Sequence, residues 1–231
     1  MKLREFLKKQ ANYRIPGTRS WKMRQKRMDK FNLWFHDLFM QEADNSRIIH
    51  IIDVGGVPDY WKYTGFKYTN NVIITTLNLS PIPVPNGFEG RIVPAEGTAI
   101  NMKEYKDDCF DLAYSNSVIE HVGDFEKQKM MAKEIRRVAP HGYLQTPNKY
   151  FFMEPHFLFP YFQLIPRSIR IILIKRFQLG NYKRASSKEE AEQIVDSVRL
   201  LSYKDILFLF PKTEIVREKW MGLTKSFVVK W

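Results

Sequence analysis

Five apolar segments alternate with amphipathic or polar segments between residues 47 and 147. Most are rich in β-branched residues, and the first two are apolar on both faces, which is typical of parallel strands buried in the middle of a sheet. The predicted strands are residues 47–54, 71–79, 90–95, 109–115 and 142–147. Asp124 is a good N-cap for a helix that continues to Val138, between the fourth and fifth strands. Strands and helices that alternate in this way predict a doubly wound α/β sheet.

A helical pattern precedes the first strand. Its apolar positions, which share one face of a helix, are Met28, Phe31, Phe35 and Leu38. They predict an amphipathic helix over residues 21–41, after a polar and basic segment of twenty residues that reads as a loosely attached arm. We therefore divide the chain into an N-terminal arm with its helix, residues 1–46, and a main domain, residues 47–231.

The pattern changes after residue 150. Residues 151–184 are aromatic, basic and interrupted by prolines, and they lack the alternation of apolar and polar residues that is typical of strands. Helical spacing returns at the apolar positions Ala191, Ile194, Val195 and Val198. Ser202 and Asp205 then form a capping-box pattern for a short helix that Pro211 ends.

Two strand-like segments, residues 213–220 and 223–231, follow that helix and predict an antiparallel hairpin. The complete expectation is a mostly parallel sheet of seven strands that carries helices on both faces and has an antiparallel C-terminal hairpin.

The net charge of +12 is unevenly distributed. Residues 1–30 contain eleven Lys and Arg against two acids, and residues 160–188 contain seven and no acid. Such patches attract nucleic acid, anionic lipid or a phosphorylated substrate, although a solvated basic face explains them equally well. The sequence contains no recognisable RNA-binding module, which disfavours nucleic acid.

Three features predict a cytoplasmic protein, and peripheral contact with a membrane through the basic segments is compatible with them. Cys109 is the only cysteine, so an internal disulfide is excluded. The first ten residues are charged throughout, unlike a signal peptide. No apolar run approaches the roughly 18 residues that a membrane-spanning helix needs.

The segment "IIDVGGVPDYW" after the first strand has the form of a ligand-binding loop. Gly55 and Gly56 allow a sharp turn and the close approach of a ligand, and Pro58 suits a first helical turn. The dinucleotide pattern GxGxxG is absent, which argues against a nicotinamide-dependent enzyme. Asp53 suits a ligand with an amino group instead. A plain β–α turn remains the alternative.

The next strands also end in polar or small residues. Asn78 ends the second strand, 22 residues beyond Gly56, where nucleoside-binding sheets place a carboxylate for the ribose. The third strand leads into a loop with Thr98 and Ala99. The fourth strand ends in polar side chains and is followed by two titratable ones; these four are Ser115, Asn116, Glu120 and His121.

These segments together resemble the class I S-adenosylmethionine (SAM)-dependent methyltransferases, especially the broad small-molecule group. The resemblance lies in "IIDVGG", "VIITTLNLS", "AEGTAINM", "DDCFDLAYSNSVIEHVGD" and "KEIRRVAPHGYLQTPN", and it covers roughly residues 47–150. It implies a Rossmann-like sheet, SAM as cofactor and methyl transfer as activity.

The resemblance also implies site residues. Asp53, Gly55 and Gly56 match the loop that holds the amino-acid part of SAM, and Asn78 takes the place of the ribose-binding acid. Thr98 and Ala99 take the places of the residues that line the adenine. Ser115 and Asn116 take the places of the residues that flank the methionine moiety. The later loop glycines are missing, Asn78 replaces an acid, and Thr98 stands where an acid is common.

A hydroxyl acceptor must also lose a proton, typically to His, Glu or Asp. His121 is the preferred candidate, with Glu120, because both follow the fourth strand; a helix-start histidine bonded to the backbone is an equal alternative. Glu154 and His156 flank a proline and are expected to line the acceptor pocket, unless they only form a turn. No HxxxH or HExxH spacing occurs, so no metal is expected.

Two functions follow from these patterns. The first is a methyltransferase for a small-molecule, glycan-linked or lipid-linked acceptor, methylated on oxygen or nitrogen, with residues 151–184 as a cap that selects it. The second is a non-catalytic module that binds RNA or anionic membrane through the basic arm. The charges of residues 167–177 scatter around a helical wheel, which favours a partly buried cap helix over a membrane-surface helix.

Overall fold

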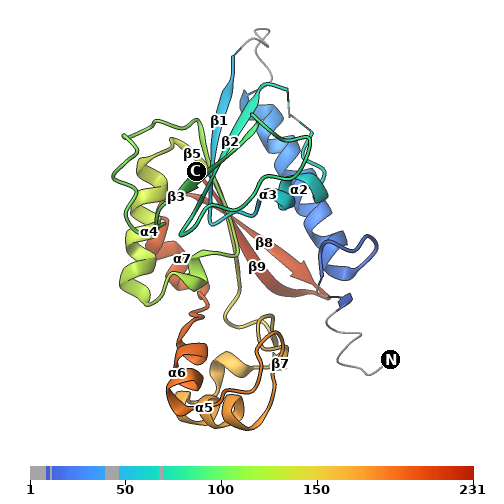
Figure 1. Ribbon diagram of the computed structural model, residues 1–231, viewed down its shortest axis with the longest axis vertical. Helices are drawn as coiled ribbons and strands as arrows, with labels where there is room; N and C mark the ends of the chain where they lie inside the picture. The colour runs from blue at the N-terminus through green and yellow to red at the C-terminus, as the bar shows by residue number, and fades with distance from the viewer. Residues whose placement is uncertain (1–8, 11, 40–46, 68–69) are drawn as a thin grey trace.

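The computed structural model describes residues 9–10, 12–39, 47–67 and 70–231. Seven strands form one sheet in the order β3-β2-β1-β4-β5-β9-β8 (Figure 1). The strands are β1 (Ile49–Val54), β2 (Val72–Asn78), β3 (Ile92–Glu96), β4 (Leu112–Asn116), β5 (His141–Pro147), β8 (Glu214–Trp220) and β9 (Leu223–Lys230). The first five are parallel, and β9 is antiparallel to both β5 and β8. The predicted fold class is confirmed.

Helices cover both faces of the sheet, as Figure 1 shows. One face packs against α4 (Phe125–Arg137) and α7 (Tyr203–Leu209), with Met131, Ile135 and Ile206 fully buried. The other face packs against α2 (Arg19–Phe39) and α3 (Pro58–Tyr63). Each face therefore has its own hydrophobic core, as a doubly wound sheet requires.

The amphipathic N-terminal helix is confirmed as α2. Its predicted stripe residues Met28, Phe31 and Phe35 have no exposed surface, and Phe31 packs edge-on against Tyr114 and Tyr143 of the sheet. The end of the helix predicted at residue 41 and the first eight residues of the predicted arm lie outside the described part of the chain. The basic N-terminal region of the sequence is thus attached to the sheet by a helix, α2, that packs against it.

Local capping explains where two of the helices begin. The Asp124 side chain accepts a hydrogen bond from the Lys127 amide at 2.9 Å, as predicted for α4. Ser202 and Asp205 form the predicted capping box of α7. The helix predicted to include Val198 is α6 (Lys188–Asp196), which ends before that residue.

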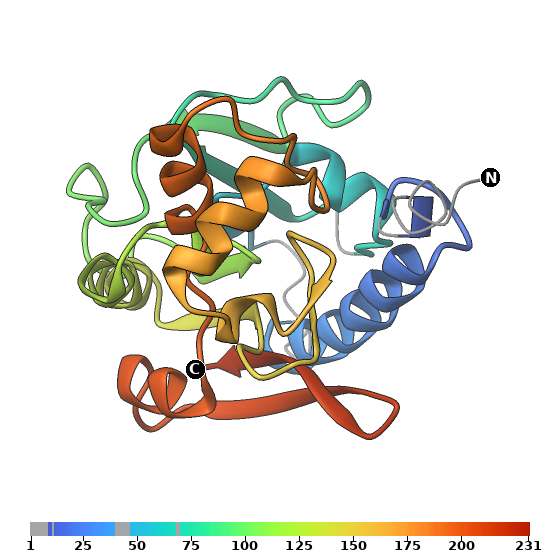
Figure 2. The same cartoon turned by 90° about the horizontal axis from the view of Figure 1, so that it is seen from below.

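A smaller lobe follows the carboxyl end of β5. It contains the short hairpin β6 (Met153–Glu154) with β7 (Phe159–Pro160), the 3-10 turn η2 (Phe162–Leu164), α5 (Arg167–Arg176) and α6. Its two helices lie side by side (Figure 2) and share a hydrophobic core that contains Phe157, Ile174 and Val195. Helix α5 is partly buried, as predicted, with Ile169 and Ile172 on its exposed side. None of the helices in the described ranges is long and apolar enough to cross a membrane.

Candidate functional site

The loop after β1 brings the backbone close to its neighbours. Gly55 has a φ of +73°, which favours glycine, and a Cβ there would lie 2.6 Å from a Val118 methyl carbon. A Cβ on Gly56 would lie only 1.7 Å from Oδ2 of Asp53. Space therefore excludes a side chain at both positions, and the left-handed backbone of the turn adds a second reason at Gly55.

The Asp53 carboxyl lies beneath this loop and is 1 % exposed. Oδ2 accepts a hydrogen bond from the Trp61 indole nitrogen at 2.7 Å, whereas Oδ1 is buried without a hydrogen-bond partner among the described residues. Burial raises the pKa of Asp53 to about 7, and the Trp61 hydrogen bond opposes that rise. A buried carboxyl oxygen that lacks a partner fits a nearby ammonium group.

Replacing Asp53 by Asn should change how stability depends on pH. The folded-state pKa of about 7 exceeds the ordinary value of 3.8, so the protonated form is favoured by folding and stability is lost as pH rises from about 4 through 7. Asp53→Asn should therefore be more stable than wild type at pH 8, by up to about 4 kcal/mol, and similar at pH 4. Urea unfolding of the ligand-free protein at both pH values measures this, with the exposed Asp29→Asn as control; parallel pH profiles of wild type and Asp53→Asn would contradict it.

Asn78 and the loop after β3 lie beside the glycine turn. The Asn78 amide nitrogen donates to the Gly56 carbonyl at 2.9 Å, so the end of β2 is tied to the loop. Thr98 forms an isolated bridge with Asn101 in the loop after β3, and Ala99 follows it half-buried. The structure thus brings the predicted Asp53, Gly56 and Asn78 to one place, while their contacts with a cofactor stay a prediction.

The two residues at the end of β4 face different surroundings. The Ser115 hydroxyl is fully buried and donates to the Val54 carbonyl at 3.0 Å, which ties β4 to β1. The Asn116 side-chain oxygen accepts a hydrogen bond from the Arg27 guanidinium at 2.6 Å. Arg27 was not among the predicted site residues, because it reaches the strand end from α2 and no local motif marks it.

Arg27 also forms a buried ion pair with Glu218 of β8. Its Nε and Nη2 donate to the two carboxylate oxygens at 2.8 and 2.6 Å. The Ser226 hydroxyl donates to the same carboxylate at 2.6 Å. The Arg27 charge holds the pKa of Glu218 below its ordinary value although burial alone would raise it. This pair joins the N-terminal helix to the C-terminal hairpin next to the site.

A pocket of about 430 Å³ opens beside these residues. Phe151, Phe152 and Trp220 supply an aromatic wall, and the two phenylalanine rings pack on Trp220 with centroids 6.1 and 5.8 Å away. Arg24 and Lys225 also line the pocket and form no ion pair with any described residue. A larger hollow of about 670 Å³ lies between α4 and α7, away from the strand ends.

Arg24 and Lys225, the two pocket cations without an acidic partner among the described residues, are partly desolvated, and Arg24 also lies over the Tyr13 ring at 4.3 Å. Burial lowers the pKa of Lys225 to about 8, and the Arg27 charge lowers it further, whereas Glu218 opposes this. The Lys225 ammonium donates to the Met23 sulfur at 2.9 Å. Burial likewise lowers the pKa of Arg24. A pocket with an aromatic wall and unpaired cations is suited to an anionic group on an apolar body.

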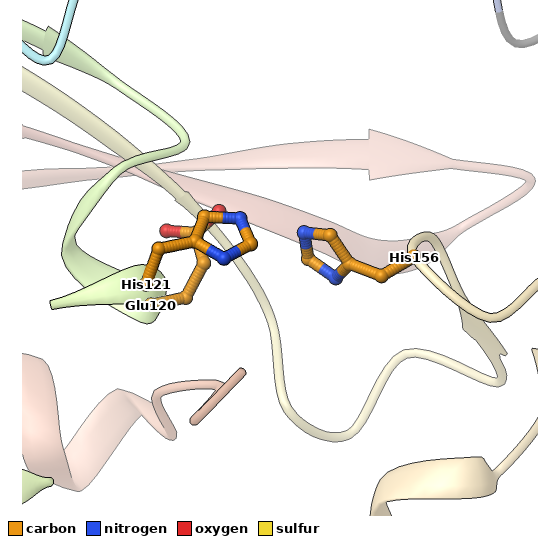
Figure 3. Close-up of side chains that lie close together, drawn as sticks. All are labelled: Glu120, His121 and His156. Carbon is orange, nitrogen blue, oxygen red and sulfur yellow. The ribbon is translucent and has the colours of Figure 1, made fainter. Parts of the chain in front are cut away.

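Glu120, His121 and His156 lie close together, as Figure 3 shows, and His156 also lines this pocket. Glu120 and His121 belong to the 3-10 turn η1 (Ile119–His121) after β4, and His156 belongs to the smaller lobe. The two imidazole rings lie edge to face, with centroids 4.7 Å apart. The structure thus brings the two candidate proton acceptors, Glu120 and His121, next to His156, whose ring is hydrogen-bonded to Glu154.

The environment of each group differs. Burial raises the pKa of Glu120 to about 7. Burial lowers the pKa of His121, and the nearby His156 lowers it further, although the side chain keeps contact with solvent. Burial alone would lower the pKa of His156, but the hydrogen bond and charge of Glu154 raise it overall. Glu120 and His121 remain predicted, not demonstrated, catalytic residues.

No protein-family model and no curated protein matches the sequence. Among solved structures, the chain is similar to magnesium protoporphyrin IX methyltransferase from Synechocystis PCC 6803 with bound SAH, with a TM-score of 0.51, 9 % identity, and coverage of 89 % of this chain and 81 % of that chain. The N-methyltransferase NodS from Bradyrhizobium japonicum WM9 gives a TM-score of 0.49 and 8 % identity over 94 % of this chain and 97 % of that chain. At such identities the likeness concerns the fold alone. The strand order and this likeness together show that the chain has the fold of the class I SAM-dependent methyltransferases.

Proposed function

We propose that the protein is a SAM-dependent methyltransferase. The observation that carries the proposal is the turn at Gly55 and Gly56, which excludes side chains and covers a buried Asp53 oxygen without a partner. This loop fits the amino-acid part of SAM, because its backbone can approach a zwitterion closely and Asp53 can face the ammonium group. Asn78 would hold the ribose through the side-chain oxygen that its bond to Gly56 leaves free.

SAM, when bound, supplies an activated methyl group, so the protein mainly has to position the acceptor and exclude water. The pocket at the ends of β4 and β5 is suited to this task, since Ser117, Gln145 and Asn148 line it together with the smaller lobe. If the acceptor is a hydroxyl, His121 is the candidate for taking its proton. We take the acceptor to be a small or lipid-linked molecule that combines an anionic group with an apolar or aromatic body.

Lys225 is expected to select that anionic group. In a coupled assay that follows SAH release, paired acceptors that differ only in a carboxylate and its amide should show a wild-type preference for the carboxylate. Lys225→Met should reduce this preference about tenfold, equivalent to about 1.4 kcal/mol for a partly buried charge pair. Lys219→Met, on the exposed side of β8, is the matched control and should keep the preference.

Calorimetry with SAM tests the broader proposal before any acceptor is known. Binding of one SAM per chain is the expected result. A wild-type protein that binds no SAM at millimolar concentration would overturn the enzyme assignment and leave the non-catalytic alternative. An unchanged carboxylate preference in Lys225→Met, with SAM binding intact, would overturn only the acceptor class.

A further inference from the structure

Three donor groups from two distant segments converge beside the pocket that His156 lines. One ligand atom of each of Glu120, His121 and His156 lies within 4.8 Å of the others. Figure 3 shows the two imidazole rings facing each other with the Glu120 carboxylate beside His121. Two imidazoles and one carboxylate form a donor set that suits divalent transition metals.

The hydrogen bonds of the two rings leave the same nitrogen free on each. His121 Nδ1 lies 3.3 Å from the Ser197 carbonyl, which can only accept, so Nδ1 carries the proton of the neutral ring. His156 Nδ1 lies 2.6 Å from Oε1 of Glu154, and this carboxylate likewise favours the proton on Nδ1. Both Nε2 atoms are then available as ligands. A metal-bound histidine usually has its other ring nitrogen held by a carboxylate or a carbonyl.

Glu154 is itself held rigidly. Its Oε2 accepts hydrogen bonds from the backbone amides of His156 and Phe157 at 2.8 and 2.6 Å, and it is 1 % exposed. The carboxylate therefore fixes the ring of His156 in place before any ligand binds. This arrangement reduces the conformational freedom that metal binding would otherwise have to remove.

Glu120 supplies an independent observation. It has no exposed surface, and Oε2 accepts a hydrogen bond from the Thr146 hydroxyl at 3.0 Å. Oε1 is buried and has no hydrogen-bond partner among the described residues. A buried carboxylate oxygen without a partner is costly unless a cation or a proton satisfies it. The unsatisfied oxygen belongs to the same cluster as the two free imidazole nitrogens.

We propose that Glu120, His121 and His156 bind one divalent transition-metal ion of the zinc class. The ligands of a tetrahedral zinc ion lie about 3.4 Å apart, so binding must draw the three side chains together by roughly 1 Å. His121 keeps contact with solvent, which gives its ring room for that movement. The expectation of no metal rested on short sequence spacings, and these ligands come from two distant segments.

The position of the ion suggests its role. His156 lines the 430 Å³ pocket, so a coordination position not taken by the protein would face the acceptor. A metal there would bind an acceptor oxygen and lower the pKa of its hydroxyl proton. This role rests on the proposed methyl transfer, whereas metal binding itself does not.

Titration of the chelator-stripped 231-residue chain with Co²⁺ and Zn²⁺, without SAM or acceptor, tests the site. Wild type should bind one ion, give the visible absorption of histidine-ligated Co²⁺, and show a higher thermal midpoint with Zn²⁺. His156→Asn should weaken binding at least 100-fold and abolish the thermal shift, and Glu120→Gln should weaken it at least tenfold. His50→Asn, an exposed histidine of β1, is the matched control and should behave as wild type.

Two results would overturn the proposal: no ion bound by wild type at 1 mM metal, or equal affinity in wild type and His156→Asn. Circular dichroism and thermal midpoints without metal show that each variant is folded. Glu120→Gln keeps this comparison meaningful, because it removes a buried charge with little change in shape. SAM binding in a protein that binds no metal would reject this inference alone, and metal binding without SAM binding would reject the proposed function alone.

Discussion

Gly55→Ala should abolish measurable SAM binding, a loss of at least 100-fold. The new Cβ would lie 2.6 and 2.7 Å from the two Val118 methyl carbons, at a backbone position with a φ of +73°. A left-handed conformation costs an alanine roughly 1–2 kcal/mol, and the β-branched Val118 has few alternative rotamers that would relieve the contact. The loop must therefore move out of the place where the cofactor approaches. Calorimetry with SAM measures the effect.

Gly87→Ala separates the effect of backbone strain from the effect of the contact with Val118. Gly87 has a φ of +87° and no atom within 4 Å of the position of an added Cβ, so it carries the backbone strain without the contact. It should lose about 1–2 kcal/mol of unfolding free energy and keep its SAM affinity. Equal SAM affinity in Gly55→Ala and wild type would show that the turn does not hold the cofactor.

Arg27→Met should destabilise the protein by about 3 kcal/mol. The change leaves the Glu218 carboxylate with 14 % of its side chain exposed and without its cationic partner. Removing one member of a buried ion pair typically costs 3–5 kcal/mol, because the remaining charge is uncompensated. The Asn116 oxygen also loses its donor. Urea unfolding at pH 7 measures the loss.

Two controls define the origin of that effect. Arg27→Met combined with Glu218→Leu should recover most of the lost stability, since no buried charge remains. Lys129→Met breaks an exposed pair with Glu126 on α4 and should change stability by no more than about 0.5 kcal/mol. A double variant as unstable as Arg27→Met would mean that packing, and not charge, is responsible.

The sheet could be predicted from the sequence because its central strands are buried on both faces. Apolar runs mark β1 and β2, and turn or capping residues such as Asp124 mark where the next element begins. The C-terminal hairpin followed from the short break between two strand-like segments. The helix that was extended to Val198 ends at Asp196, and Val198 packs against the core of the smaller lobe from the segment after the helix. Spacing alone cannot separate these two cases.

The candidate site was only partly predictable. Gly55 and Gly56 are recognisable because a tight β–α turn has a local signature. Arg27 has none, since its partners Asn116 and Glu218 lie 89 and 191 residues away. The meeting of His156 with Glu120 and His121 depends on how the smaller lobe folds back over the ends of the strands. Contacts of this kind are set by tertiary packing, which no short motif encodes.

The position of β9 has a consequence for the order in which the protein can fold. Strand β9 lies between β5 and β8, so the open edge of β5 is paired only when residues 223–230 are present. The Arg27–Glu218 pair likewise joins regions from opposite ends of the chain. During synthesis on the ribosome, β5 therefore leaves the exit tunnel with unpaired backbone groups along one side. The sheet is completed only after residues 223–230 have emerged, and the contact between Arg27 and Glu218 cannot form before then.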